Sequence, residues 1–170
     1  MAGTFVPISG AVIGTTAYVG GKLVARDCAI TLPDVSPMTA TLPLMGEMEF
    51  PLWPLISNMQ ATVSKVGIDV LSATMIAPDL TPIEFRWVQQ VMKVDGTTAQ
   101  VGCKAFMNGL TASIPGGSAE VGSPIESDHT LNLMRYRLVI DGREVVLIDR
   151  TAGKVVINGK DYTRGVNTML

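Results

Sequence analysis

Charged residues are scarce in this sequence. Asp, Glu, Lys and Arg make up 16% of its 170 residues, whereas roughly a quarter is usual in soluble proteins. The net charge at pH 7 is −2, and the lysines and arginines are not clustered. A protein that grips nucleic acid needs a concentrated basic surface to neutralise phosphates. The composition therefore argues against tight nucleic-acid binding, but it is compatible with a surface past which nucleic acid slides.

Cysteine and histidine are almost absent as well. The only cysteines are Cys28 and Cys103, and the only histidine is His129. Two cysteines without the spacing of a metal motif are too few for a disulfide framework, so we expect buried free thiols in a protein made for a reducing cytoplasm. No cluster of His, Cys and carboxylates has the spacing of metal ligands. The sequence therefore predicts neither a metal site nor a cofactor.

Sequence motifs of the common enzyme classes are missing too. There is no Gly-x-Ser-x-Gly elbow for a nucleophilic serine and no glycine-rich phosphate loop. Asp128 and His129 are neighbours, and neighbours in a strand point to opposite faces, so they cannot form a catalytic dyad. We expect His129 on the surface, where a strand begins. The chain is therefore expected to have no enzymatic activity; a hydrolase on a β scaffold is a distant alternative without a supporting constellation of residues.

Long apolar runs are absent. No stretch reaches the roughly 18 apolar residues of a membrane-spanning helix. The first fifteen residues are apolar, but they lack a basic start and are interrupted by Pro7 and Gly10, so a signal peptide is not expected. We interpret residues 1–16 as an extended N-terminal arm that becomes ordered in an assembly.

What the chain does contain is the alternation of apolar and polar residues that is typical of strands. In the clearest case, 83–94, Phe85 and Trp87 share one face. Over 130–140 the odd-numbered residues are expected on one face and the even-numbered ones on the other. Gly-Gly, Asp-Gly and Asn-Gly pairs mark hairpin turns, and one short helix is expected over 68–75. The predicted fold class is mainly β: an antiparallel β-sandwich or barrel with one short helix and a long projecting hairpin or loop.

The segment 33–54 departs from this pattern, because it carries half of the ten prolines in the chain. Proline cannot donate to a strand ladder, so this segment is expected to project from the core as a hairpin or long loop. Its apolar side chains then need a partner, and we expect contacts between subunits there. The candidate inter-subunit contacts are Leu44, Met45, Met48, Phe50 and Trp53.

The overall balance of apolar residues also points to assembly. The mean hydropathy is +0.34, and 47% of the residues are hydrophobic. Large exposed apolar patches are rare on monomers, so part of the surface is expected to be covered by subunit contacts. A monomer with a well-buried interior is the alternative.

The C-terminal run 134–161 carries a resemblance to a known family. It reads MRYRLVIDGREVVLIDRTAGKVVINGKD: three short strands separated by Asp141-Gly142 and by Thr151-Ala152-Gly153, ending in Asn158-Gly159-Lys160-Asp161. This order resembles the closing segment of the major tail tube proteins of contractile-tailed bacteriophages. The segments that follow the family's order are 18–19, 29–34, 85–87 and 104–109 upstream of this run, and 135–138 within it. A lone Gly46 stands where the family has a glycine-rich turn.

The resemblance covers roughly residues 17–162 and implies a single tail-tube domain over 1–170, with 33–54 as its long loop or hairpin. It implies hexameric rings stacked into a tube inside a contractile sheath. The implied partners are the chain itself, the tail sheath protein, baseplate or initiator and tail terminator proteins, and a tape-measure protein or DNA in the lumen without tight binding; no membrane is implied. The implied location is the virion tail, assembled in the host bacterial cytoplasm. The tubes of phage-tail-like bacteriocins and of type VI secretion are similar, and the resemblance covers them equally.

A ring of this kind is physically sensible. Four strands from each of six subunits at ~4.8 Å spacing give a circumference near ~115 Å and a backbone diameter of ~37 Å before tilt. Such a ring passes duplex DNA, which is roughly 20 Å across. A wall that must release its cargo is expected to be neutral to acidic. The candidate channel-wall residues are Glu47, Glu49, Asp79, Glu84 and Asp128.

The alternative reading is a lipocalin-like β-barrel that binds a small molecule. That function requires a closed monomer with an inward-facing apolar cavity. The proline-rich segment and the low charge fit such a barrel less well than they fit a subunit of an assembly.

Overall fold

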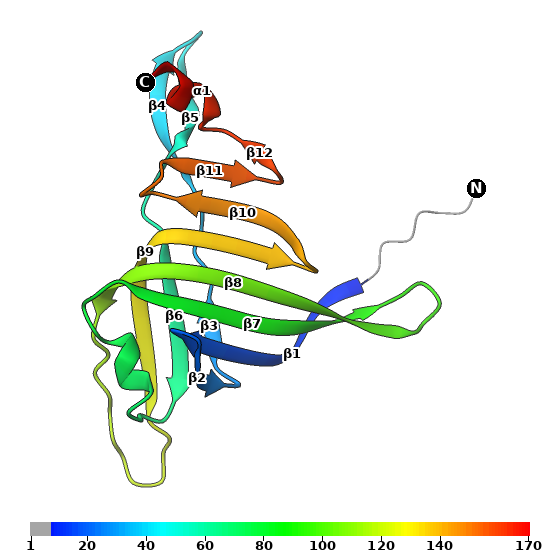
Figure 1. Cartoon of the computed structure of the whole chain (residues 1–170), viewed down its shortest axis with the longest axis vertical. Coiled ribbons are helices and arrows are strands. Elements are labelled where there is room, and N and C mark those ends of the chain that lie inside the picture. The colour runs from blue at the N-terminus through cyan, green and yellow to red at the C-terminus, as the bar shows by residue number, and fades with distance from the viewer. Residues whose placement is uncertain (1–7) are drawn as a thin grey trace.

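The computed structural model describes residues 8–170, in which antiparallel strands predominate (Figure 1). In chain order the strands are β1 (Ile8–Val19), β2 (Lys22–Arg26), β3 (Ala29–Thr31), β4 (Pro37–Pro43), β5 (Glu47–Ile56), β6 (Gln60–Val66), β7 (Thr81–Met92), β8 (Thr98–Ser113), β9 (Glu126–Ile140), β10 (Arg143–Asp149), β11 (Lys154–Ile157) and β12 (Lys160–Asp161). The 3-10 helix η1 (Ser72–Met75) and the α-helix α1 (Arg164–Met169) complete the described elements. The mainly β, antiparallel class predicted from the sequence is confirmed. Within the described residues, no helix has the length and apolar character needed to cross a membrane.

Ten of the described strands form one sheet, whose path runs β12-β11-β10-β9-β8-β7-β1-β2. β6 pairs with the first half of β9 and also with β3, so the sheet branches at β9. In Figure 1, β6 and this part of β9 run nearly upright across β1, β7 and β8, which makes two layers. β4 and β5 pair with each other and form a separate two-stranded hairpin.

The core lies between the two layers. Phe85 and Trp87 point into it from β7, with ring centroids 5.7 Å apart, so the face predicted for this pair is confirmed. Cys28 and Cys103 are buried free thiols, as predicted, and burial raises the pKa of both. The facing layer contributes Met59, Ala61, Val63, Leu131 and Leu133.

One strand, β9, belongs to both layers, because the residues that point inward change from odd-numbered to even-numbered positions midway along it. Up to Leu133 the odd-numbered residues are buried, but beyond it Arg135 is exposed and Tyr136 is buried. The odd–even prediction for 130–140 is therefore wrong. A strict period of two holds only while the ladder is regular.

The irregularity is a β-bulge at Met134. In the pairing of β9 with β8, Leu133 lies opposite Gly109 and Arg135 lies opposite Asn108, so Met134 is an extra residue without a partner in β8. A bulge bends its strand and turns the following side chains to the other face. This bend lets the first half of β9 pair with β6 while the second half pairs with β10.

The predicted hairpin turns have the expected backbone. Asp141 and Gly142 have φ of 49° and 74°, and Asn158 and Gly159 have φ of 50° and 79°. Positive φ at both central positions is the requirement of a type I′ turn. The Asp-Gly and Asn-Gly signals are therefore confirmed.

Two other expectations need correction. Within the interval 1–16, the chain from Ile8 onward belongs to β1 and pairs along β7, so this part is a strand of the sheet; residues 1–7 lie outside the described residues. The helix expected over 68–75 is limited to η1, a single 3-10 turn. The α-helix of the described chain is α1 instead, and it buries no residue, so it left no apolar periodicity to detect.

Gly109 allows the first prediction. A Cβ at this position would lie 2.9 Å from both the carbonyl oxygen of Asn132 and Cδ2 of Leu133. We expect Gly109→Ala to lower the free energy of unfolding by about 1–3 kcal/mol, because the bulge has to move. Gly102→Ala is the matched control, since it lies on the same strand and an added Cβ meets nothing within 4 Å. Urea denaturation measures both variants; an equal loss would show that the bulge tolerates a side chain.

Candidate functional site: assembly surfaces

The distal part of the β4–β5 hairpin is the first surface without a partner among the described residues. It projects at the top of Figure 1, beyond β11 and β12. Its distal ladder runs from Met38 opposite Leu52 to Pro43 opposite Glu47. The prolines of 33–54 are tolerated here because each strand has only one neighbouring strand. An isolated two-stranded hairpin is marginally stable in water, so a further contact surface is expected for it.

Apolar side chains are concentrated near the tip of this hairpin. The exposed fraction is 110% for Met45 and 58% for Leu44 at the turn, and Met48 and Phe50 on β5 are about half exposed. The structure therefore places four of the five predicted contact residues on the projecting part of the hairpin. Trp53 is different: it is half-buried at the base, and its ring centroid lies 6.4 Å from that of Tyr162.

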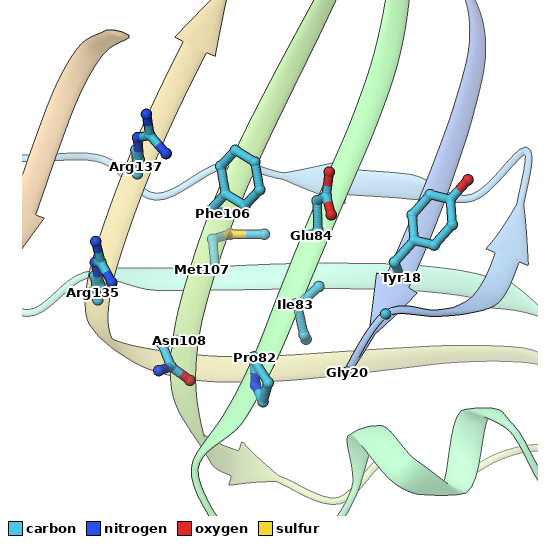
Figure 2. Close-up of a pocket in the computed structure, with 11 residues that line it drawn as sticks. Tyr18, Gly20, Pro82, Ile83, Glu84, Phe106, Met107, Asn108, Arg135 and Arg137 are labelled. Atoms are coloured by element: carbon cyan, nitrogen blue, oxygen red, sulfur yellow. The ribbon is translucent and has the colours of Figure 1, made fainter.

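The second surface is the side of β1, β7, β8 and the second half of β9 that faces away from the core. We call it the outer face. The strand register places Tyr18, Glu84, Phe106 and Arg137 in one row across these four strands, and Figure 2 shows that row. The Arg137 guanidinium lies 5.5 Å from the centre of the Phe106 ring. The row therefore combines flat aromatic and guanidinium groups on a regular ladder.

Most charges on the outer face are paired. The Nε atom of Arg86 lies 2.5 Å from a Glu84 oxygen, and the Arg86 guanidinium also lies 4.6 Å from the Tyr18 ring. Two more arginines pair with carboxylates of β10: the N–O distance is 2.5 Å from Arg137 to Glu144 and 3.8 Å from Arg135 to Asp149. These pairs are exposed and contribute little to stability. Their consequence is electrostatic, because they leave the face close to neutral.

Two cations on this side have no ion pair within residues 8–170. They are Arg26 and Lys104. The register connects Arg26 to Thr16, Thr16 to Arg86 and Arg86 to Lys104, so these cations lie in the row beside the aromatic one. The outer face is therefore close to neutral, with a small basic excess.

A shallow groove of about 410 Å³ crosses the outer face (Figure 2). Its lining includes Tyr18, Phe106, Asn108 and Arg135. The Oδ1 atom of Asn108 is buried there and has no hydrogen-bond partner in the described part of the chain. Aromatic, guanidinium and amide groups suit contact with a polar surface.

The five predicted channel-wall carboxylates do not share one surface. Glu84 lies on the outer face, whereas Glu47 and Glu49 lie on β5 of the hairpin. Asp79 precedes β7, and Asp128 lies in the first half of β9, where β9 pairs with β6. The sequence indicates which residues of one strand share a face, but it does not indicate which strands lie in the same layer. The signal that marks the outer face is the pair of arginines at 135 and 137, which share a parity with the exposed side of β9 after the bulge.

His129 is buried, contrary to the prediction of a surface position. Only 4% of it is exposed, because the segment 68–76 and Pro115 enclose it in a small cavity of about 90 Å³. Its Nε2 atom lies 3.4 Å from Oγ of Ser127, and its Nδ1 atom has no partner among the described residues. Burial lowers the pKa of His129, and the charge of Lys65 adds to this effect.

Known proteins resemble this chain in sequence and in fold. The family model of phage tail tube protein FII matches residues 11–170. Two solved cryo-EM structures from an extracellular contractile injection system, PVC, are similar. The sheath/tube terminator has a TM-score of 0.56 at 15% identity, over 80% of this chain and 99% of that chain. The sheath–tube complex in the extended state has a TM-score of 0.50 at 15% identity, over 74% of this chain and 87% of that chain. No curated protein sequence matches.

The burial of His129 predicts a dependence of stability on pH. Because the pKa is lowered in the folded state, the unfolded state takes up the proton first, and the free energy of unfolding falls as the pH drops below about 6.5. The slope is at most about 1.4 kcal/mol per pH unit for one proton. Urea denaturation between pH 7 and pH 5 measures it.

His129→Gln is the matched variant, since a neutral amide cannot take up the proton. The carboxylates whose pKa is lowered, Asp69, Asp95 and Asp161, have an ordinary pKa of 3.8 and therefore act at lower pH than this window. We expect the variant to lose the slope. The same slope in both proteins would contradict the assignment to His129.

Proposed function

Because the chain belongs to the phage tail tube protein FII family, and is therefore a structural tail tube protein, we propose that six copies form a ring and that rings stack around a channel for DNA. The observation that carries this proposal is a sheet with unpaired edges beside a projecting apolar hairpin. β2 covers β1 only from Thr16 to Val19, so the earlier part of β1 has β7 on one side and no described strand on the other. The other end of the path is β12, which has two residues.

Side-by-side association of subunits would extend the ladder through these edges. Closing the ring removes unpaired edges, which otherwise invite aggregation. The described sheet is an open path and not a closed monomeric barrel, which supports a ring subunit over the lipocalin-like alternative. A closed small-molecule barrel would need its first and last strands to pair within one chain.

We place the outer face on the channel wall. β1, β7, β8 and β9 supply four adjacent strands with a regular row of side chains across them. Glu84 is the one predicted wall residue on this face. The arginines there are paired with carboxylates, so a passing polyanion meets few free cations and is not held tightly. The wall is therefore close to neutral, which fits passage better than binding.

We place the hairpin between subunits. Leu44, Met45, Met48 and Phe50 present an apolar surface that nothing in the described chain covers. A second copy of the same chain is the partner that the family implies.

The proposed partners outside the ring follow from the similar structures. Those come from a sheath–tube complex and a sheath/tube terminator, which supports a tail sheath protein and a terminator as partners of this chain. A baseplate or initiator protein, a tape-measure protein in the lumen, and assembly in the host cytoplasm before incorporation into a tail are further parts of the proposal.

The test is assembly of the full-length purified chain. Negative-stain electron microscopy should show six-fold rings or tubes. The double variant Leu44→Asp/Met45→Asp should remain folded, with an unchanged melting temperature, but should not polymerise, because charge replaces the apolar tip. Deletion of residues 40–49 should give the same result.

Val121→Asp is the control, since Val121 is equally exposed but lies in the loop before β9. It should polymerise as the unchanged chain does. Polymerisation of the hairpin variants, or unfolding caused by the deletion, would contradict the role of the hairpin. An unchanged chain that stays monomeric at high concentration would contradict ring formation by this chain alone.

A further inference from the structure

The hairpin has a break at its base. Met38 lies opposite Leu52 but the preceding Pro37 lies opposite Ile56, so the residues 53–55 have no partner in β4. These three residues form a bulge that contains Pro54. The bulge separates the distal ladder from a single pair at the base, and it is therefore the point at which the hairpin can bend.

The base below the bulge is tied to the body of the protein. The backbone N and Oγ of Ser57 both donate to the carbonyl oxygen of Ser36, at 2.9 Å and 2.8 Å. Arg150 then reaches the same place: its Nη2 donates to the carbonyl oxygen of Ile56 at 3.2 Å and also to that of Ser57. The backbone N of Arg150 donates to the carbonyl oxygen of Met134 at 3.0 Å. One arginine thus connects the hairpin base to the bulge of β9.

The bulge at the hairpin base, residues 53–55, makes an aromatic contact with the C-terminal part of the chain. The rings of Trp53 and Tyr162 lie 6.4 Å apart. Tyr162 is fixed in turn, because its backbone N donates to the carbonyl oxygen of Val155 at 2.9 Å, and the Lys160 ammonium lies 5.1 Å from its ring. Arg150 and Tyr162 both belong to the C-terminal part of the chain; Arg150 binds the backbone directly after the bulge, and Tyr162 contacts Trp53 within it.

We propose that Arg150 and Tyr162 are positioning residues that fix the angle between the β4–β5 hairpin and the sheet. The distal ladder is about 20 Å long at ~3.3 Å per residue, so a bend of ~15° at its base moves the tip by about 5 Å. A displacement of that size exceeds the tolerance of van der Waals packing against a second copy. The consequence for assembly rests on the proposed function, whereas the fixed angle is a property of the single chain.

The angle is measured by double electron–electron resonance between spin labels at Met45→Cys and Lys104→Cys. Both positions are exposed, and the native cysteines are buried. Labelled protein is diluted into an excess of unlabelled protein, so that only distances within one chain are read. We expect one narrow distance distribution in the otherwise unchanged chain.

Arg150→Ala and Tyr162→Ala should each broaden this distribution in the labelled chain, and each should reduce tube formation in the chain that carries no labels. Arg150→Lys, which keeps the charge and one donor group, should restore part of the narrow distribution. Two matched controls should leave it narrow. Tyr162→Phe keeps the ring that contacts Trp53, and Arg143→Ala removes an exposed arginine on β10 that makes no ion pair in residues 8–170.

A narrow distribution in both alanine variants would overturn the proposal, and so would equal broadening in the controls. Broadening without any loss of tube formation would overturn the consequence for assembly while leaving the fixed angle in place. Failure of the unchanged chain to form tubes would count against the proposed function and would not alter the distance measurement.

Discussion

The bulge at Met134 determines how the two halves of the molecule are related. Before it, β9 turns its odd-numbered side chains inward and pairs with β6; after it, Tyr136 points inward and β9 pairs with β10. A regular strand would keep one face throughout and could not line both layers. Gly109 makes the bulge possible, because the backbone of Asn132 approaches too closely for a side chain. The same place also anchors Arg150, whose backbone N donates to the carbonyl oxygen of Met134.

The low charge of the chain is explained by how its apolar residues are distributed. One part fills the core between the layers, around Phe85 and Trp87. Another part lies on the exposed β4–β5 hairpin, at Leu44, Met45 and Phe50, where apolar side chains in contact with water do not stabilise a monomer. The outer face, by contrast, is polar and nearly neutral because its arginines lie beside carboxylates. The surface that we propose for assembly and the surface that we propose for passage are thus separate on one small protein.

Local signals in the sequence predicted much of the fold. Asp141-Gly142 and Asn158-Gly159 predicted turns because these residue pairs adopt positive φ readily. The alternation around Phe85 and Trp87 predicted a buried face. The resemblance to tail tube proteins, carried by the order of such short motifs, is confirmed by the family match. Apart from the projecting hairpin, most of the candidate site could not be predicted from the sequence.

The misses have a common physical cause, because they depend on contacts between segments far apart in the chain. His129 is buried by residues 68–76 and Pro115, which no local pattern places there. The bulge at Met134 changed the parity of β9, and the contact of Trp53 with Tyr162 joins residues more than 100 positions apart in the chain. The carboxylates chosen for a channel wall were chosen by charge, whereas the strand register decides which side chains share a face.

The proposed channel depends most on which surface of the sheet faces inward. A cryo-EM reconstruction of the assembled tube, at a resolution that traces β7 and β8, tests this directly. The result expected is a ring of six subunits in which Tyr18, Phe106 and Arg137 line the channel and the hairpin tips lie between adjacent rings. A tube whose channel is lined by the hairpin tips, or in which the outer face points away from the channel, would contradict it.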